Sequence, residues 1–128
     1  MFQAVVDALA FEARLNLARL QGQGIHVAEL RAVGGGARSR KILELKATVL
    51  QRPIRTLKVP EAALLGAALV AEVATGTFRD IKEGCRACVE IDQTIEPSAS
   101  ATAAYDNAFE RFCGLYELLR PFHHQRSL

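Results

Sequence analysis

Apolar residues recur along this chain with the periods of alternating helices and strands. Residues 2–22 repeat their apolar positions near the 3.6-residue period, which predicts a first helix. Residues 29–33 alternate as a short strand that runs into three consecutive glycines. Ser39 is a natural N-cap for a second amphipathic helix that Pro53 closes, and residues 54–59 predict a second, less regular strand.

The segment 62–75 is apolar on nearly all sides, and such a helix is expected to be buried. Pro60 and Glu61 open this helix, and Gly76 suits its C-cap. Two predicted strands are too few to shield it, so part of the sheet is expected to be missing. The first helix has no N-cap residue ahead of it, as in a chain interrupted near that point or a terminus that frays.

The last third of the chain predicts two more helices. Asp80 and Glu83 resemble a capping box for a short helix through residue 89, and a loop containing Pro97 follows. The final helix carries a stripe that is core by default, formed by Tyr105, Phe109, Phe112, Tyr116 and Leu119. Pro121 is predicted to stop this helix and to leave the polar tail His123-His124-Gln125-Arg126.

Composition narrows the class of protein. The 128 residues fit one domain, and 16 basic against 14 acidic residues give a net charge of +2, which does not indicate nucleic acid or an anionic membrane as a partner. The longest apolar run, residues 62–70, is far shorter than the roughly 20 residues that span a bilayer, and no signal peptide is recognisable. Three cysteines, an odd number, fit a reducing cytoplasm.

The most informative chemistry lies in the turn Gly34-Gly35-Gly36-Ala37-Arg38-Ser39 between a strand and a helix. A backbone without Cβ atoms lets a ligand approach closely, and the helix that follows presents free N–H groups and a partial positive charge. These features predict a nucleotide contact. The third glycine of a dinucleotide fingerprint and the lysine of a P-loop are both absent, so a tight turn with a purely structural role is the alternative.

Other candidate chemistry is weaker. Cys85 and Cys88 lack the second ligand pair of a zinc site, and Cys113 or His123 would complete a set only by coincidence; small core residues are the favoured interpretation. The four aspartates fall on predicted helices or in loops, away from the glycines: Asp7, Asp80, Asp92 and Asp106. No catalytic residue or metal ligand is therefore predicted.

Several blocks in the same order resemble the C-terminal part of FGGY-family carbohydrate kinases, closest to the xylulokinase branch. The likeness covers almost the whole chain and is much more specific than the glycines alone. The matching blocks are residues 4–12, 29–39, 49–54 and 61–69, then Tyr105 and residues 115–123.

This resemblance implies an α/β fold, namely an incomplete RNase H-like domain of the actin/hexokinase-type ATPase fold, helix-rich with about two strands. Residues 1–128 would form part of the C-terminal kinase domain. The resemblance also implies that the turn contacts the adenosine part of ATP or ADP, through Gly34, Gly35, Gly36, Ala37 and Ser39. Mg²⁺ and the sugar, a pentulose such as xylulose, would be held outside this chain.

The expected partner is the missing N-terminal kinase half, in cis or in trans, and the chain alone is expected to be inactive. A split-kinase subunit or regulatory binding module is an alternative, and a non-functional relic is another. The chain also departs from its relatives, with Ile42 and Glu44 where they have Trp and Gln, and Gln51 where they have Gly. Glu44 would repel phosphate if it faced the cleft.

Overall fold

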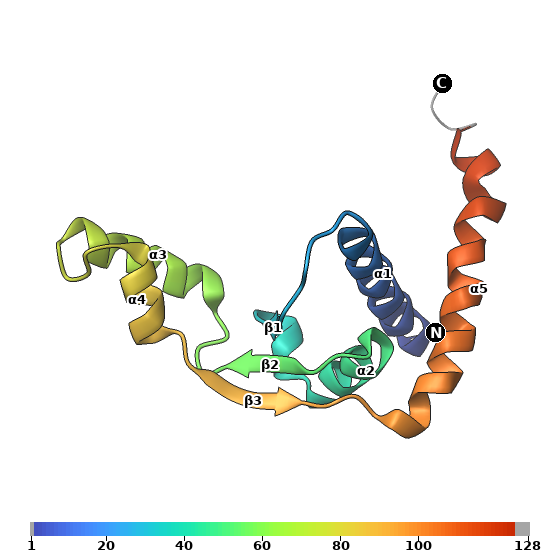
Figure 1. The fold of residues 1–128 in the computed structure, drawn as a ribbon, viewed down its shortest axis with the longest axis horizontal. Helices are drawn as coiled ribbons and strands as arrows, with labels where there is room; N and C mark the ends of the chain where they lie inside the picture. Colours follow the sequence, from blue (N-terminus) through green and yellow to red (C-terminus); the bar gives the residue numbers. More distant parts are fainter. Residues whose placement is uncertain (1, 125–128) are drawn as a thin grey trace.

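A computed structural model describes residues 2–124. Three strands form one small sheet in the order β1-β2-β3, and helices lie at both ends of the molecule (Figure 1). The elements in chain order are α1 (Phe2–Gly22), β1 (Leu30–Ala32), the 3₁₀ turn η1 (Gly35–Arg38), α2 (Arg40–Leu50), β2 (Ile54–Leu57), α3 (Ala62–Ala74), α4 (Ile81–Cys88), β3 (Ile91–Ile95) and α5 (Ala99–His124). The predicted order of helices and strands is confirmed from α1 to α4, but an unpredicted strand, β3, lies between α4 and α5.

The third strand is a correction, because the sequence predicts only two. β1 and β2 are parallel, with Leu30 opposite Ile54, whereas β3 runs antiparallel to β2, with Ile95 opposite Ile54. Only Ile95 of β3 is buried. A strand held at a sheet edge by backbone pairing needs no alternating apolar face, so its sequence carries no strand signal.

The first core lies between the sheet and α2. Leu43 and Ala47 on one face of α2 pack against Ile54 and Ile95 of the sheet, and all four side chains are buried. Leu30 on β1 adds a half-buried wall. One apolar face of α2 therefore packs on the sheet, whereas Leu45 and Val49 of the same helix belong to the second core.

The second core joins α1, α2 and α5. The Phe11 ring lies 5.5–6.3 Å from three aromatic rings of α5, those of Tyr105, Phe109 and Phe112. Val49 of α2 completes this core and is fully buried. The prediction that the stripe of the last helix belongs to the core is confirmed for these three rings. It is wrong for Leu119, which is exposed, and the side chain of Tyr116 lies outside the described residues.

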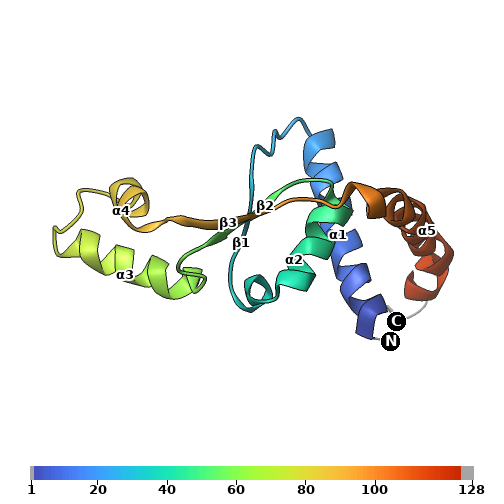
Figure 2. The same ribbon diagram turned by 90° about the horizontal axis from the view of Figure 1, so that it is seen from below.

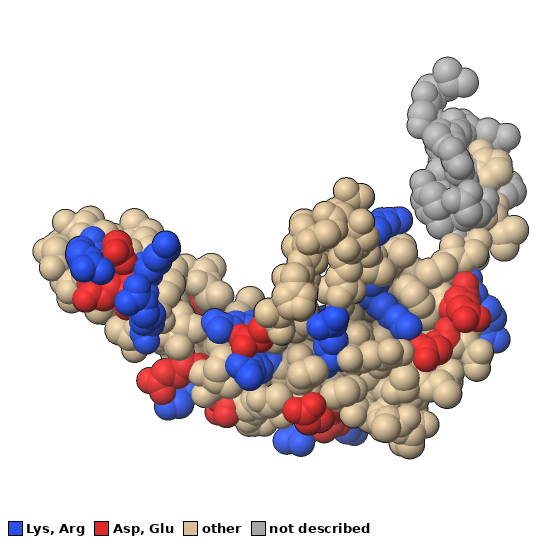
Figure 3. Space-filling model, in the orientation of Figure 1, with Lys and Arg blue, Asp and Glu red and all other residues tan. Residues whose placement is uncertain are grey.

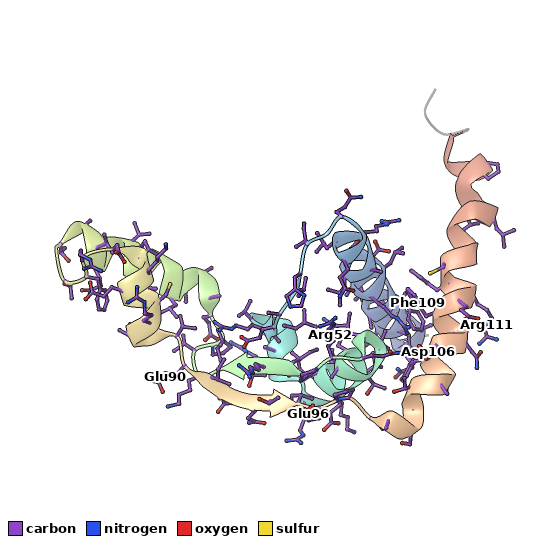
Figure 4. The ribbon with its side chains drawn as sticks, viewed as in Figure 1. Arg52, Glu90, Glu96, Asp106, Phe109 and Arg111 are labelled. Carbon is purple, nitrogen blue, oxygen red and sulfur yellow. The ribbon has the colours of Figure 1, made fainter. Side chains whose placement is uncertain are left out.

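Polar side chains of α1 and α5, together with Gln51 at the end of α2, interact beside the second core. Asp106 of α5 forms an ion pair with Arg14 of α1 at 2.7 Å and accepts a hydrogen bond from Gln51 Nε2 at 2.6 Å. The Arg14 guanidinium also lies 4.3 Å from the centre of the Phe109 ring, a cation–π contact. Figure 4 shows Asp106 and Phe109 on the stretch of α5 that passes α1. One carboxylate thus connects three helices.

The helices α3 and α4 form an arm, residues 62–88, that projects away from the sheet in both ribbon views (Figures 1 and 2). The expectation that α3 is buried is wrong for this chain: Leu69 is 4% exposed, but Leu64 is 71% and Val70 60% exposed. The reason is that α3 packs mainly on α4, which covers one side of it. Within residues 2–124 no helix has the length and apolar character to cross a bilayer.

Two of the predicted helix ends are confirmed and one is wrong. Asp80 caps α4 by accepting the Glu83 N–H at 2.8 Å, as predicted. Gly76 follows α3 with φ +81°, which suits the glycine that ends a helix. Pro121 does not stop α5, which continues to His124. A proline removes one helical N–H but has itself a helical φ, so a helix can run through it.

Candidate functional site

The glycine turn lies at the carboxyl end of β1, next to the start of the arm. Gly34 adopts φ 73° and ψ −163°, a backbone region that is nearly restricted to glycine. Its N–H donates to the Pro60 carbonyl at 2.7 Å, and its own carbonyl accepts the Ala37 N–H at 3.0 Å. Glycine is therefore required at position 34 by the backbone itself.

The other two glycines have no such structural requirement. A Cβ atom built at Gly35 or Gly36 meets no atom within 4 Å, and both residues are exposed. Neither has a positive φ. Their side-chain-free backbone borders open space, which is the arrangement that allows a flat ligand to lie against it.

The amino end of α2 adds polar groups beside this turn. Ser39 occupies the N-cap position as predicted, but its side chain makes no capping hydrogen bond. No acidic residue lies in the first turn of α2, which carries Arg40 and Lys41 instead. The free N–H groups and the partial positive charge of the helix start are therefore available to an anion.

Glu44 does not act as a free negative charge at this helix start. Its carboxylate forms an ion pair with Arg40 at 2.8 Å, one turn earlier on the same helix. This pairing offsets the negative charge of Glu44, which the sequence predicts would repel phosphate if it faced the cleft.

A second ion pair fixes the turn to the arm. Arg38 of η1 donates to Glu61 Oε1 at 2.6 Å, immediately before α3. This hydrogen bond lowers the pKa of the Glu61 carboxyl below its ordinary value. The Gly34–Pro60 bond lies at the same junction. Figure 3 shows basic and acidic side chains interspersed over this face of the molecule, so it presents no extended field of one sign.

A cavity of about 320 Å³ opens beside Ala37 and Arg38. One of the residues that line it is an aspartate whose position the sequence predicts wrongly. Asp92 lies on β3 and lines this cavity, where the sequence places it in a loop or on a helix away from the glycines. Its Oδ2 is 3.5 Å from Thr56 Oγ1 of the neighbouring strand. Sequence reasoning missed Asp92 and Thr56 because β3 was not recognisable as a strand.

The remaining candidates lie apart from this turn. Cys85 and Cys88 are on α4 and Cys113 is on α5, at opposite ends of the molecule, and all three are free thiols that are half-buried (Figure 1). The side chain of His123 lies outside the described residues. In the part of the chain that the structure describes, no three histidine, cysteine or acidic side chains gather as metal ligands would.

Comparison with known proteins places the chain in a family. Residues 1–75 match the model of the FGGY family of carbohydrate kinases, C-terminal domain. The L-xylulose/3-keto-L-gulonate kinase of Escherichia coli K12 is 29% identical over 123 residues, which cover 96% of this chain and 25% of that protein.

Solved structures agree. The xylulose kinase of Rhodospirillum rubrum superposes with a TM-score of 0.76 and 33% identity over 94% of this chain and 25% of that one. A ligand-bound xylulose kinase from Lactobacillus acidophilus shares the fold with a TM-score of 0.80 at 23% identity, covering 97% of this chain and 25% of that one.

The expected fold class, an RNase H-like part of the actin/hexokinase-type fold, is confirmed, with a third strand in place of the two predicted. The chain spans about a quarter of the length of the relatives it matches. By the match of its first 75 residues, the chain belongs to the FGGY family of carbohydrate kinases.

Proposed function

We propose that this chain is the nucleotide-contacting portion of an ATP-dependent kinase that phosphorylates a sugar hydroxyl. A pentulose such as xylulose is the proposed substrate class, since xylulose kinases are among the similar proteins in both sequence and structure. The observation that carries the proposal is the glycine turn, which borders open space at the carboxyl end of β1. Ligands of open α/β sheets bind outside the carboxyl ends of the strands.

The proposed binding residues are those of the turn and the helix start: Gly34, Gly35, Gly36, Ala37 and Ser39. Gly34 sets the direction of the turn, and Gly35 and Gly36 offer a flat surface for ribose and adenine. The Ser39 hydroxyl makes no capping bond to α2, which leaves it available to a ligand. These residues fit the adenosine part of ATP or ADP.

ATP supplies the phosphoryl group when it is bound, and this chain's residues would bind and orient the adenosine end. Phosphoryl transfer also needs carboxylates that hold Mg²⁺ and donors around the phosphates. Among the side chains that the structure describes, no group of histidine, cysteine or acidic residues could hold a metal ion. We therefore propose that Mg²⁺ and the sugar are bound by the N-terminal kinase half, and that this chain alone, a cytoplasmic protein, is inactive.

The test compares residues 1–128 alone with the same chain mixed with the part of the Rhodospirillum rubrum xylulose kinase that lacks the matching quarter. The readouts are sugar-dependent ADP release and binding of a fluorescent ADP analogue. We expect no activity from the chain alone and measurable activity from the mixture. Sugar-dependent ADP release by the chain alone would contradict the claim that it is inactive.

Gly35→Val tests the site itself. A Cβ built at Gly35 meets no atom of the chain within 4 Å and Gly35 is exposed, so the fold is expected to persist while the ligand surface is blocked. We expect the mixture to bind the ADP analogue at least about tenfold more weakly. Gly22→Val is the matched control, because a Cβ at Gly22 also meets nothing within 4 Å and this residue lies at the end of α1. Equal binding by both variants would contradict the assignment.

A second candidate function is a split-kinase subunit or regulatory module that docks on a separate kinase half. The observation that favours it is the apolar arm, on which Leu64 and Val70 are exposed. An apolar helix surface of this kind marks an interaction site. Co-expression with an N-terminal kinase half tests this candidate by co-purification. Separate elution of the two chains, without activity, would exclude it.

A further inference from the structure

A groove between α1 and α5 lies far from the glycine turn and plays no part in the proposed function. Among the described rings of α5, Phe112 is the last that packs on Phe11, and beyond it the two helices diverge (Figure 1). The groove between them encloses about 330 Å³ and is walled by Leu15 of α1 and by Phe112, Leu115 and Leu119 of α5.

The apolar surface extends past the groove itself. Leu118 is 71% exposed, and Leu115 and Leu119 are also exposed although they line the groove. Contiguous apolar surface next to a concave site is typical of a surface that binds a protein partner.

Two opposite charges on α1 lie at the rim of this groove. Glu12 and Arg19 both line it and are seven residues apart, so they lie on the same side of the helix, about 10 Å from each other, with Leu15 between them. Among the side chains that the structure describes, neither forms an ion pair.

We propose that a second copy of this chain covers the groove, with the two α1 helices antiparallel across a two-fold axis near Leu15. In that arrangement Glu12 of each copy faces Arg19 of the other, and the two apolar walls cover each other. A two-fold interface requires a patch that is complementary to itself. Glu12 lies three residues before Leu15 and Arg19 four residues after it, so a negative and a positive charge flank one apolar residue and meet this requirement. The chain's small net charge of +2 opposes the approach of two copies only weakly.

Charge reversal tests the pairing by sedimentation equilibrium of the full chain. Glu12→Arg and Arg19→Glu each place like charges opposite one another at both symmetric contacts, so each variant is expected to dimerise at least about tenfold more weakly. The double variant restores both contacts and is expected to dimerise like the natural chain. Glu72→Arg and Lys82→Glu are the matched controls, because they make the same charge changes at exposed positions on the arm.

Mixing the two single variants gives the sharpest result. In a heterodimer of Glu12→Arg with Arg19→Glu, each contact again joins opposite charges, so the mixture is expected to dimerise although neither variant does so alone. Association of the natural chain that is unaffected by either reversal would overturn the proposal and assign the contact to another surface, such as the arm. A natural chain that stays monomeric would also overturn it.

Thiol reactivity gives an independent measurement. Cys113 lines the groove, whereas Cys85 and Cys88 lie on the arm. Alkylation of Cys113 is expected to slow as the chain concentration rises through the dimerisation range, while Cys85 and Cys88 react at an unchanged rate. Protection of the arm thiols without protection of Cys113 would overturn the proposal.

Discussion

Gln51 has a backbone conformation that costs free energy, and its side chain recovers some of that cost. It ends α2 with φ 54° and ψ 36°, and it is the one non-glycine residue of the described part with a positive φ. This left-handed conformation costs a residue with a side chain about 1 kcal/mol relative to glycine. The Gln51 side chain donates to Asp106 Oδ1 at 2.6 Å, a hydrogen bond that contributes about 1 kcal/mol.

These two magnitudes predict that the effect of Gln51→Gly on the free energy of unfolding depends on whether Asp106 is present. In the natural chain, Gln51→Gly removes both the strain and the hydrogen bond, so the free energy of unfolding should change by less than about 0.5 kcal/mol. In an Asp106→Ala chain the hydrogen bond is already absent, and the same substitution should stabilise the fold by about 1 kcal/mol. Urea denaturation of the four chains, followed by far-ultraviolet circular dichroism, measures this coupling.

Gln21→Gly is the control for the glycine itself. Gln21 lies within α1, where a glycine is expected to destabilise by up to about 1 kcal/mol in both backgrounds. Destabilisation by Gln51→Gly in the Asp106→Ala chain would refute the assignment of strain to residue 51. Equal changes in both backgrounds would refute the contribution of the hydrogen bond.

Two further predictions concern the arm and its attachment. Gly84→Ala places a Cβ 2.8 Å from Leu69 Cδ2, and this overlap should destabilise the arm by about 1–3 kcal/mol. Faster hydrogen exchange of the backbone amides in α3 and α4 would measure this loss. Gly66→Ala is the control, because a Cβ there meets nothing within 4 Å and should not speed the exchange. The hydrogen bond from Arg38 lowers the pKa of Glu61, so its stabilising effect is present at neutral pH and is lost as pH falls through the lowered pKa. Arg38→Ala should raise that pKa in a carboxyl titration followed by NMR, and an unchanged value would contradict the stated cause.

The sequence was sufficient where a local pattern determines the structure. The 3.6-residue period of α2 and the cap at Asp80 both depend on residues near in sequence, and each is found in the structure. The outline of the candidate site was predictable for the same reason, since the turn and the helix start adjoin in sequence. Whether these residues bind a nucleotide stays a prediction.

What the sequence could not reveal depends on contacts between distant residues. β3 is held by pairing with β2, and four of its five residues are exposed, so no apolar alternation marks it. Asp92 reaches the cavity beside Ala37 only because this strand exists. The apolar composition of α3 predicts that this helix is buried, but it does not show whether the chain contains elements that pack against all its sides. In the described part of this chain they do not, and Leu64 and Val70 are exposed.

The two bonds between the turn and the start of the arm have a mechanical consequence. The Gly34 amide holds the Pro60 carbonyl, and Arg38 holds the carboxylate of Glu61, so the residues that begin α3 are fastened to both ends of the turn. A displacement of the arm would therefore be transmitted to the turn through these two bonds. A partner that bound α3 would therefore also act on the positions of Gly35 and Gly36, and so on the backbone surface offered to a ligand.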